Sequence, residues 1–242
     1  MRTYRALSAL LTYPTADLQA AAPAIRETLA EGLLPPAHVA AIEPLLQDLE
    51  TSDIYDLQER FVLLFDRSRT LSLNLFEHIH GESRDRGGAM VDLLETYRAG
   101  GFDLQGPELP DHLPVLLEFL STRLPAEAAA ILSDAGHILV ALAERLNRRE
   151  SVYAPVLAAL VTLAQATPET EEAKILLSEA DDDPEDLDAL DAVWEEAQVT
   201  FGPDPNAGCP VSRDILAKMD MPLSPARAPQ AQAAGQGGTN NV

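Results

Sequence analysis

Residues 152–164, with the sequence VYAPVLAALVTLA, decide the fold class of this chain. The stretch is apolar almost all the way round a helix, whereas a surface helix carries a single apolar stripe. We therefore expect a helix at the centre of the core. The longest apolar run in it, residues 154–164, is well short of the ~18 apolar residues that a membrane-spanning helix needs.

The segments before this stretch also follow helical spacing. The apolar residues of 54–65 fall on one helical face, and those of 90–97 do the same after a plausible N-cap at Ser83. Residues 113–124 predict a further helix, and Pro125 suits the first position of the next one. In that next helix we expect one apolar stripe, made of Ile131, Ala135, Ile138, Leu142 and Leu146.

These patterns predict an all-α protein, a single-domain bundle of about eight to ten helices over residues 1–221. Ala and Leu supply most of the apolar residues and are the strongest helix formers, whereas aromatic residues make up only 5%. No run of alternating polar and apolar residues indicates a strand. The tail, residues 222–242, is rich in Pro, Ala, Gln and Gly, so we expect it to be disordered.

Charge excludes several classes of function. The 242 residues include 17 Lys and Arg against 39 Asp and Glu, which gives a formal net charge of −22. A nucleic-acid-binding surface needs clustered basic residues, and an anionic membrane surface would repel so acidic a chain. Thirteen acids lie in residues 169–196, where an acidic helix is expected to start at 167–169. The single cysteine excludes a disulfide framework and a Cys-rich metal site. We expect a cytoplasmic protein.

The densest group of polar residues is 72–88, with the sequence SLNLFEHIHGESRDRGG. Its Glu77, His78 and His80 are of the types that bind Zn or Fe. Because residues two apart on a helix do not face each other, His78 and His80 could share an ion only on a bent or extended backbone. The alternative is that these groups fix a helix end and its loop. The charged residues that follow could bind a partner or pair with one another: Glu82, Arg84, Asp85 and Arg86.

A second polar group is 107–114, with the sequence PELPDHLP. Prolines bracket Asp111 and His112, so this segment is a stiff entry to the following helix. Asp111 could cap that helix, or the rigid polar loop could recognise a partner. Because Glu118 lies about two helical turns beyond Asp111, both could point to one side of an apolar strip. We expect the helix to add three residues to this surface: Leu116, Glu118 and Phe119.

These segments resemble the NarJ-type chaperones, also called the delta subunit of respiratory nitrate reductase, in the wider TorD/DmsD group of redox-enzyme maturation chaperones. The resemblance covers roughly residues 4–211, with departures at Asn74 and Gly88. It rests on three motifs: LLFDR at 63–67 through SLNLFEHIHGESRDRG at 72–87, ELPDHLP at 108–114 with LEFL at 117–120, and FGP at 201–203 with Cys209 and Pro210.

The resemblance implies a system-specific chaperone that is absent from the finished enzyme and needs no cofactor. Its implied partner is the catalytic (alpha) subunit of nitrate reductase, notably the N-terminal segment, held competent for molybdenum cofactor insertion before membrane docking. A helical bundle can offer an apolar groove to an amphipathic helix, and an acidic rim attracts basic residues. We expect the partner surface to include Phe65, Arg67, Phe76, Glu77, His78, His80, Arg84, Arg86, Glu108, Pro110, Asp111, His112, Leu116, Glu118 and Phe119.

The residues alone leave an enzyme as the alternative, namely a metal-dependent hydrolase on a helical scaffold. It would use Glu77, His78, His80, Asp111 and His112. No nucleophile motif accompanies these residues. Metal analysis separates the two hypotheses, because such a hydrolase would retain stoichiometric Zn or Fe after purification.

Overall fold

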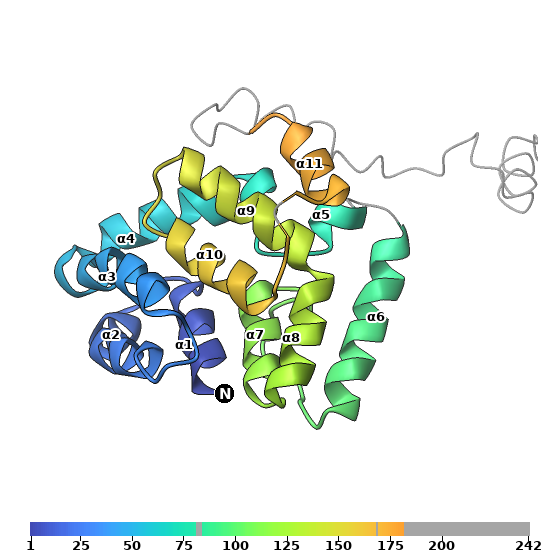
Figure 1. Cartoon of the computed structure of the whole chain (residues 1–242), viewed down its shortest axis with the longest axis horizontal. Helices are drawn as coiled ribbons and strands as arrows, with labels where there is room; N and C mark the ends of the chain where they lie inside the picture. The colour runs from blue at the N-terminus through green and yellow to red at the C-terminus, as the bar shows by residue number, and fades with distance from the viewer. Residues whose placement is uncertain (81–83, 168, 182–242) are drawn as a thin grey trace, which may run out of the picture. The chain divides into compact units, whose positions relative to one another are not determined.

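The computed structural model describes residues 1–80, 84–167 and 169–181, all within one compact unit of the chain, residues 1–193. The described residues form α-helices, one π-helix and one 3₁₀-helix, with no strand among them (Figure 1). In chain order the elements are α1 (Arg2–Leu10), α2 (Ala16–Leu29), α3 (Pro36–Thr51), α4 (Ile54–Phe61), the π-helix η1 (Val62–Asp66), the 3₁₀-helix η2 (Arg69–Leu71), α5 (Glu77–His80), α6 (Arg84–Ala99), α7 (Leu113–Ser121), α8 (Pro125–Asp134), α9 (Gly136–Arg148), α10 (Ala154–Leu163) and α11 (Glu171–Ser178).

The all-α fold class is confirmed, and local signals start several helices where the sequence predicts them. The described residues contain eleven α-helices, among them the four-residue α5, close to the predicted number of about eight to ten. A proline lies in the first turn of α3, α7, α8 and α10, and Pro125 opens α8 as predicted. α11 begins at Glu171, later than the predicted start at 167–169, because the Thr170 hydroxyl accepts the Ala173 N–H and caps the helix there.

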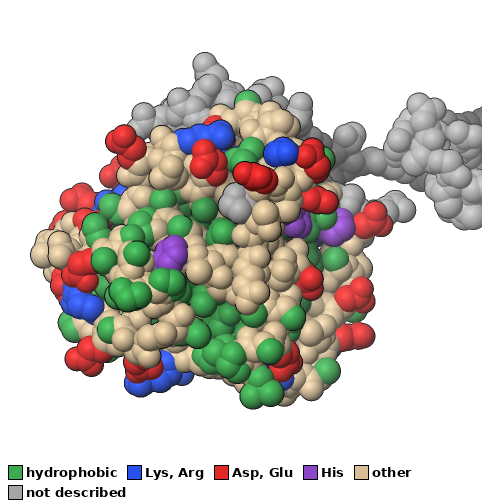
Figure 2. Space-filling view, viewed as in Figure 1, with side chains coloured by type: hydrophobic (Ala, Val, Ile, Leu, Met, Phe, Trp, Pro, Cys, Tyr) green, Lys and Arg blue, Asp and Glu red, His purple; other side chains and the backbone are tan. Residues whose placement is uncertain are grey.

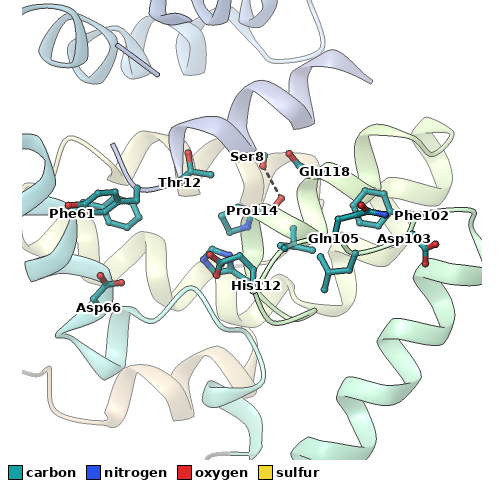
Figure 3. A pocket seen from close by; sticks show the side chains of 15 residues that line it. Ser8, Thr12, Phe61, Asp66, Phe102, Asp103, Gln105, His112, Pro114 and Glu118 are labelled. Atoms are coloured by element: carbon teal, nitrogen blue, oxygen red, sulfur yellow. Dashed lines mark hydrogen bonds and ion pairs between the residues drawn. The ribbon is translucent and has the colours of Figure 1, made fainter. Parts of the chain in front are cut away.

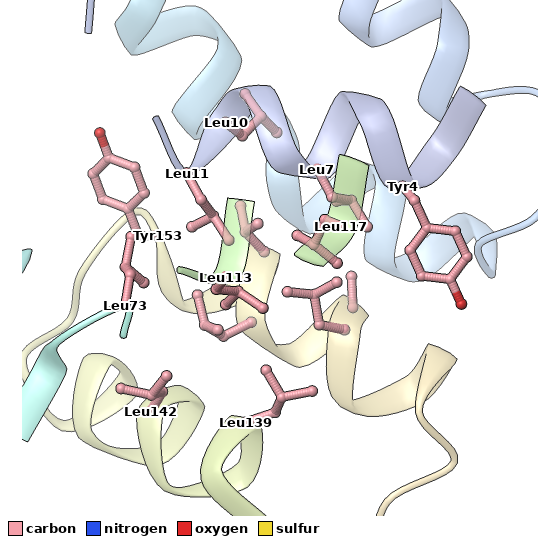
Figure 4. Packing of buried hydrophobic residues seen from close by; sticks show 14 of the residues in the cluster. Tyr4, Leu7, Leu10, Leu11, Leu73, Leu113, Leu117, Leu139, Leu142 and Tyr153 are labelled. Atoms are coloured by element: carbon pink, nitrogen blue, oxygen red, sulfur yellow. The ribbon is translucent and has the colours of Figure 1, made fainter. Parts of the chain in front are cut away.

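α10 lies in the core, as the apolar stretch 152–164 predicts. It packs against α9 and α3, and its fully buried side chains are Val156, Leu157, Ala159 and Leu160. α1 packs along α7, and Figure 4 shows Leu7 of α1 and Leu11, the residue after α1, near Leu113 and Leu117 of α7. This pairing matters for function, because α1 and α7 also supply walls of a cavity.

The prediction of one continuous helix from Pro125 through Leu146 is wrong. α8 ends at Asp134, α9 begins at Gly136, and the two helices are bent by 72°. A Cβ atom on Gly136 would lie 2.8 Å from the Cβ of Ala166, so the approach of the segment after α10 requires glycine here. The apolar spacing continues through the bend, and periodicity therefore does not reveal it.

The surface of the described residues carries scattered acidic side chains between apolar ones (Figure 2). No single helix in these residues combines the length and apolar content of a membrane span; α8 and α9 together meet that test on length and composition alone. Several predictions lie outside the described residues: the Ser83 cap, the Arg84 side chain, the motif at 201–210, the acidic segment beyond residue 181 and the tail 222–242.

Candidate functional site

Two segments that the sequence singles out, 72–80 and 108–113, lie against each other in the fold. Asn74 and His112 form an isolated antiparallel bridge between them. The bridge fixes the start of α7 to the segment that leads into α5. Two backbone hydrogen bonds flank it: the Leu113 N–H donates to the Leu73 carbonyl at 2.8 Å, and the Leu75 N–H donates to the Asp111 carbonyl at 3.1 Å.

The Asp111 side chain closes this junction from the inside. It is fully buried, and its Oδ2 accepts the Phe76 N–H at 3.0 Å. Burial raises the pKa of Asp111, while the Phe76 N–H and the charge of Arg86 act against that rise. The expectation that Asp111 caps α7 is wrong, because α7 has no side-chain cap and Asp111 bonds a residue 35 positions earlier. Asp111 therefore holds two segments together in the interior of the protein.

Several other residues expected at the partner surface are buried too. The expected surface strip of Leu116 and Phe119 is wrong, because these side chains are 4% and 1% exposed. The Phe119 ring packs against Tyr97 at 4.7 Å between centroids, and the Tyr97 hydroxyl donates to the Pro110 carbonyl at 2.7 Å. Phe65 is likewise 5% exposed. These side chains lie in the core, beneath the surface where we expected them.

A cavity of about 600 Å³ opens beside α7, and Figure 3 shows it from close by. Its walls come from α1, α4, η1, the connection between α6 and α7, and α7 itself. We call it the α7 cavity. It is lined by Ser8, Thr12, Tyr13, Phe61, Asp66, Phe102, Asp103, Leu104, Gln105, Gly106, Glu108, His112, Pro114, Val115 and Glu118.

The carboxylates that line the α7 cavity face no lining Lys or Arg. A cavity with carboxylates beside apolar walls suits a segment that carries both cationic and apolar side chains. The carboxylates are those of Asp66, Asp103, Glu108 and Glu118, and the apolar walls include Phe61, Phe102, Leu104 and Val115.

Asp66, Glu108 and His112 lie where the α7 cavity meets a smaller one of about 130 Å³. Burial lowers the pKa of His112, although Glu108, 3.7 Å away, acts to raise it. The imidazole is therefore neutral at neutral pH and does not offset the carboxylates. Burial raises the pKa of Asp66; His112 acts against this rise and Glu108 adds to it.

A second cavity of about 540 Å³ lies beside α5, and we call it the α5 cavity. Glu77 accepts hydrogen bonds from Arg86 at 3.0 Å and from Asn74 at 3.3 Å, so it has a basic partner within the protein. The His78 Nε2 lies 2.8 Å from the Ser72 carbonyl, and burial lowers the pKa of His78. The α5 cavity is lined by Arg69, Thr70, Glu77, His78, Ile79, His80, Glu179 and Ala180.

Six exposed or half-buried residues of the predicted site line the two cavities. Arg67 is exposed and lines neither of them, and the half-buried Phe76 packs edge-on against His80 at 5.8 Å between centroids. The α7 cavity contains Glu108, His112 and Glu118. The α5 cavity contains Glu77, His78 and His80.

Sequence reasoning missed two carboxylates of the α7 cavity, Asp66 and Asp103. Asp66 ends the apolar run 61–65, and an acid at the edge of such a run is a signal that could have marked it. Nothing in the sequence marks Asp103 or Ser8, because they belong to separate segments that meet only in the fold.

The residues of the hydrolase hypothesis are not assembled around one point. Glu77, His78 and His80 line the α5 cavity, His112 lines the α7 cavity, and Asp111 is bonded to Phe76. Across residues 1–80, 84–167 and 169–181, no three His, Cys, Asp or Glu side chains are grouped so as to hold a metal ion. The geometry does not support the hydrolase.

Comparisons with known proteins agree with the resemblance seen in the motifs. The family model described as nitrate reductase delta subunit matches residues 15–159. The nitrate reductase molybdenum cofactor assembly chaperone NarJ of Escherichia coli (strain K12) is 45% identical over 205 residues, 84% of this chain and 86% of that protein. The probable chaperone of the same description, NarW, from the same strain is 43% identical over 69% of this chain and 73% of its own length. The probable chaperone NarJ of Bacillus subtilis (strain 168) is 32% identical over 66% of this chain and 86% of its own length. With a matching family model over more than half of its length and relatives this similar, the chain belongs to the nitrate reductase delta subunit family.

Proposed function

We propose that this protein is a system-specific maturation chaperone for a respiratory nitrate reductase. It binds the catalytic subunit and keeps it competent for molybdenum cofactor insertion before the enzyme docks at the membrane. The observation that carries this proposal is the 45% identity, over 84% of the chain, to a protein named as a nitrate reductase molybdenum cofactor assembly chaperone. The proposed role is non-catalytic and places the protein in the cytoplasm with its unassembled partner.

The N-terminal segment of the catalytic subunit is the part that we propose is bound, and the α7 cavity is where we place it. The cavity is large enough for several side chains, at about 600 Å³, and combines aromatic walls with acidic groups and no lining Lys or Arg. An amphipathic segment would bury apolar anchors against Phe61 and Phe102 and set basic side chains near Glu108 and Glu118.

The buried residues of the two motifs support this cavity indirectly. Asp111 ties the entry of α7 to Phe76, and Tyr97 holds the Pro110 carbonyl. Both contacts fix the connection between α6 and α7, which forms one wall of the cavity. A wall that is set before the partner arrives lowers the entropy cost of binding.

Calorimetric titration of the full chain with the N-terminal peptide of the catalytic subunit tests the proposal. We expect saturable binding that weakens as salt rises, because an acidic cavity attracts basic side chains of the segment. A peptide of the same composition in scrambled order is the control and should bind far more weakly. Equal binding of both peptides, or of neither, would overturn the proposed partner segment.

A second measurement tests the chaperone role itself. Catalytic subunit produced together with this protein should contain more molybdenum than subunit produced without it. Equal molybdenum content under both conditions would contradict a role in cofactor insertion, whatever the peptide affinity.

A further inference from the structure

Residues 170–181, which we call the strap, run over the outside of α9 and end beside α5. The strap consists of the cap Thr170, the helix α11 and the three residues that follow it. α11 packs on α9, as Figure 1 shows, and buries the side chains of Ala173 and Leu176, while Ile175 is 64% exposed. The strap thus contributes a small apolar contact.

A buried arginine of α9 holds the strap in place. Arg145 is 0% exposed, and its Nη1 donates to the Thr70 carbonyl at 2.8 Å. Its Nη2 donates to the Leu176 carbonyl, and its Nε lies 3.0 Å from Oδ1 of Asp181. One guanidinium therefore joins the strap to η2, the element that leads into residues 72–80.

The strap also covers residues that the sequence predicts to meet a partner. Glu179 and Ala180 line the α5 cavity together with Glu77, His78 and His80. Because Glu179 and Ala180 belong to the strap, lifting the strap would remove one wall of that cavity. The side chains of α5 would then be open from that side.

The strap has little support from the rest of the fold, which favours its moving away from α9 and α5. A helix as short as α11 is unstable in water without tertiary support. Its support is Ala173, Leu176 and the bonds to Arg145, which places it at the low-stability end of the fold. When the strap leaves, Arg145 keeps its hydrogen bond to the Thr70 carbonyl and loses its contacts with Leu176 and Asp181.

We propose that the strap is an autoinhibitory lid over the α5 cavity, and that a cationic segment of the partner releases it by pairing with its carboxylates. The strap offers four acids for that exchange, Glu171, Glu172, Glu179 and Asp181. The identity of the partner rests on the proposed function, whereas the existence of a releasable strap does not.

Hydrogen exchange of the full chain, without any partner, tests the strap itself. In Asp181→Asn the strap loses its ion pairs with Arg145 and Arg148 of α9, and the amides of 171–178 should exchange at least about fivefold faster. The control is Glu169→Gln, which makes the same charge change just outside the strap and should exchange like the unaltered chain. Unchanged protection of 171–178 in Asp181→Asn would overturn the proposal.

Titration with the complete catalytic subunit tests the autoinhibition, because we place its N-terminal segment in the α7 cavity and a different part of it at the α5 cavity. A lid that opens more often raises the fraction of chains that can bind this second part, so Asp181→Asn should bind the subunit about threefold to tenfold more tightly, and Glu169→Gln should bind it like the unaltered chain. Faster strap exchange with unchanged or weaker affinity for the subunit would show a structural contact and overturn the lid. Binding of the subunit by none of the three proteins would overturn the proposed function and partner-driven release together, while hydrogen exchange would still decide whether the strap opens.

Discussion

The α7 cavity and the α5 cavity differ in how their charges are balanced. In the α7 cavity, Asp66, Glu108 and Glu118 lie among lining residues that include no Lys or Arg. In the α5 cavity, Glu77 pairs with Arg86, and Glu179 lies 3.9 Å from Arg145. The first cavity attracts a cationic segment directly. The second can bind one only by giving up a pairing within the protein.

The origin of the walls explains this difference. The α7 cavity is bounded by core helices and by a connection that Tyr97 and Asp111 hold in place, so its shape is set in advance. The α5 cavity has the strap as one wall. We therefore expect the α7 cavity to determine affinity for the partner and the α5 cavity to respond to its arrival.

The largest expected effect is that of Arg145→Met. The substitution leaves the carbonyls of Thr70 and Leu176 without their donor, and should lower the free energy of unfolding by about 3 kcal/mol. Urea unfolding followed by circular dichroism measures this. Arg148→Met is the comparison on the same helix; its side chain is 47% exposed and meets the strap only through a longer ion pair with Asp181, at 3.9 Å, so a change below about 1 kcal/mol is expected. Equal losses for both variants would mean that Arg145 does not hold the strap.

Asp111→Ala should have the next largest effect. It leaves the Phe76 N–H without an acceptor at a buried junction, which costs about 2 kcal/mol of unfolding free energy. Asp111→Asn should cost less, because an amide oxygen can still accept that N–H. If both variants unfold at the same urea concentration as the unaltered chain, the junction between the two motifs contributes nothing to stability.

The difference in stability between the unaltered chain and Asp111→Asn should change with pH in one direction. Burial raises the pKa of Asp111 above its ordinary 3.8, so the folded state holds this proton more tightly than the unfolded state. As pH rises from that ordinary value through the raised one, the unaltered chain loses stability relative to Asp111→Asn. Urea unfolding at a series of pH values measures the unfolding free energy of the unaltered chain minus that of the variant, which should fall as pH rises and then level off. A difference that grows over this range would contradict a raised pKa.

The sequence predicts what depends on local spacing. The apolar stretch 152–164 identifies the core helix α10, and Pro125 marks the start of α8, because periodicity and proline geometry act over a few residues. The bend between α8 and α9 escapes prediction because the contact that requires glycine there comes from Ala166, thirty residues beyond Gly136. Distant contacts decide such features.

In the candidate site, too, local patterns predict some features and distant contacts decide others. The motifs correctly mark two segments that meet, yet they give the wrong role to Asp111, because its partner Phe76 is far away in sequence. Residue type indicates that a carboxylate matters, while burial decides whether it faces a partner or holds two segments together. Asp103 joins the α7 cavity only through the path of the connection between α6 and α7, which no local pattern records.

Tyr97→Phe tests whether the α7 cavity is set in advance. Loss of the hydroxyl removes the bond to the Pro110 carbonyl and should cost about 1 kcal/mol of unfolding free energy, with the ring packing on Phe119 kept. Hydrogen exchange should rise in residues 102–112, because the hydroxyl fixes that connection, and stay unchanged in the strap. Faster exchange in the strap as well would mean that the two cavities are not independent.

The smallest effect, and the most direct on affinity, is that of the paired substitution Glu108→Gln and Glu118→Gln. Both residues are exposed and line the α7 cavity, whereas Asp111 is buried and unsuited to this test. Removing two charges without removing the side chains should weaken binding of the N-terminal peptide about threefold to fivefold and flatten its salt dependence.

The matched control is Glu59→Gln with Glu95→Gln, which makes the same charge change at exposed positions outside both cavities. If the control weakens binding as much, the net charge of the chain attracts the peptide. If neither pair changes affinity or salt slope, the peptide binds away from the α7 cavity, and the α5 cavity becomes the surface to test.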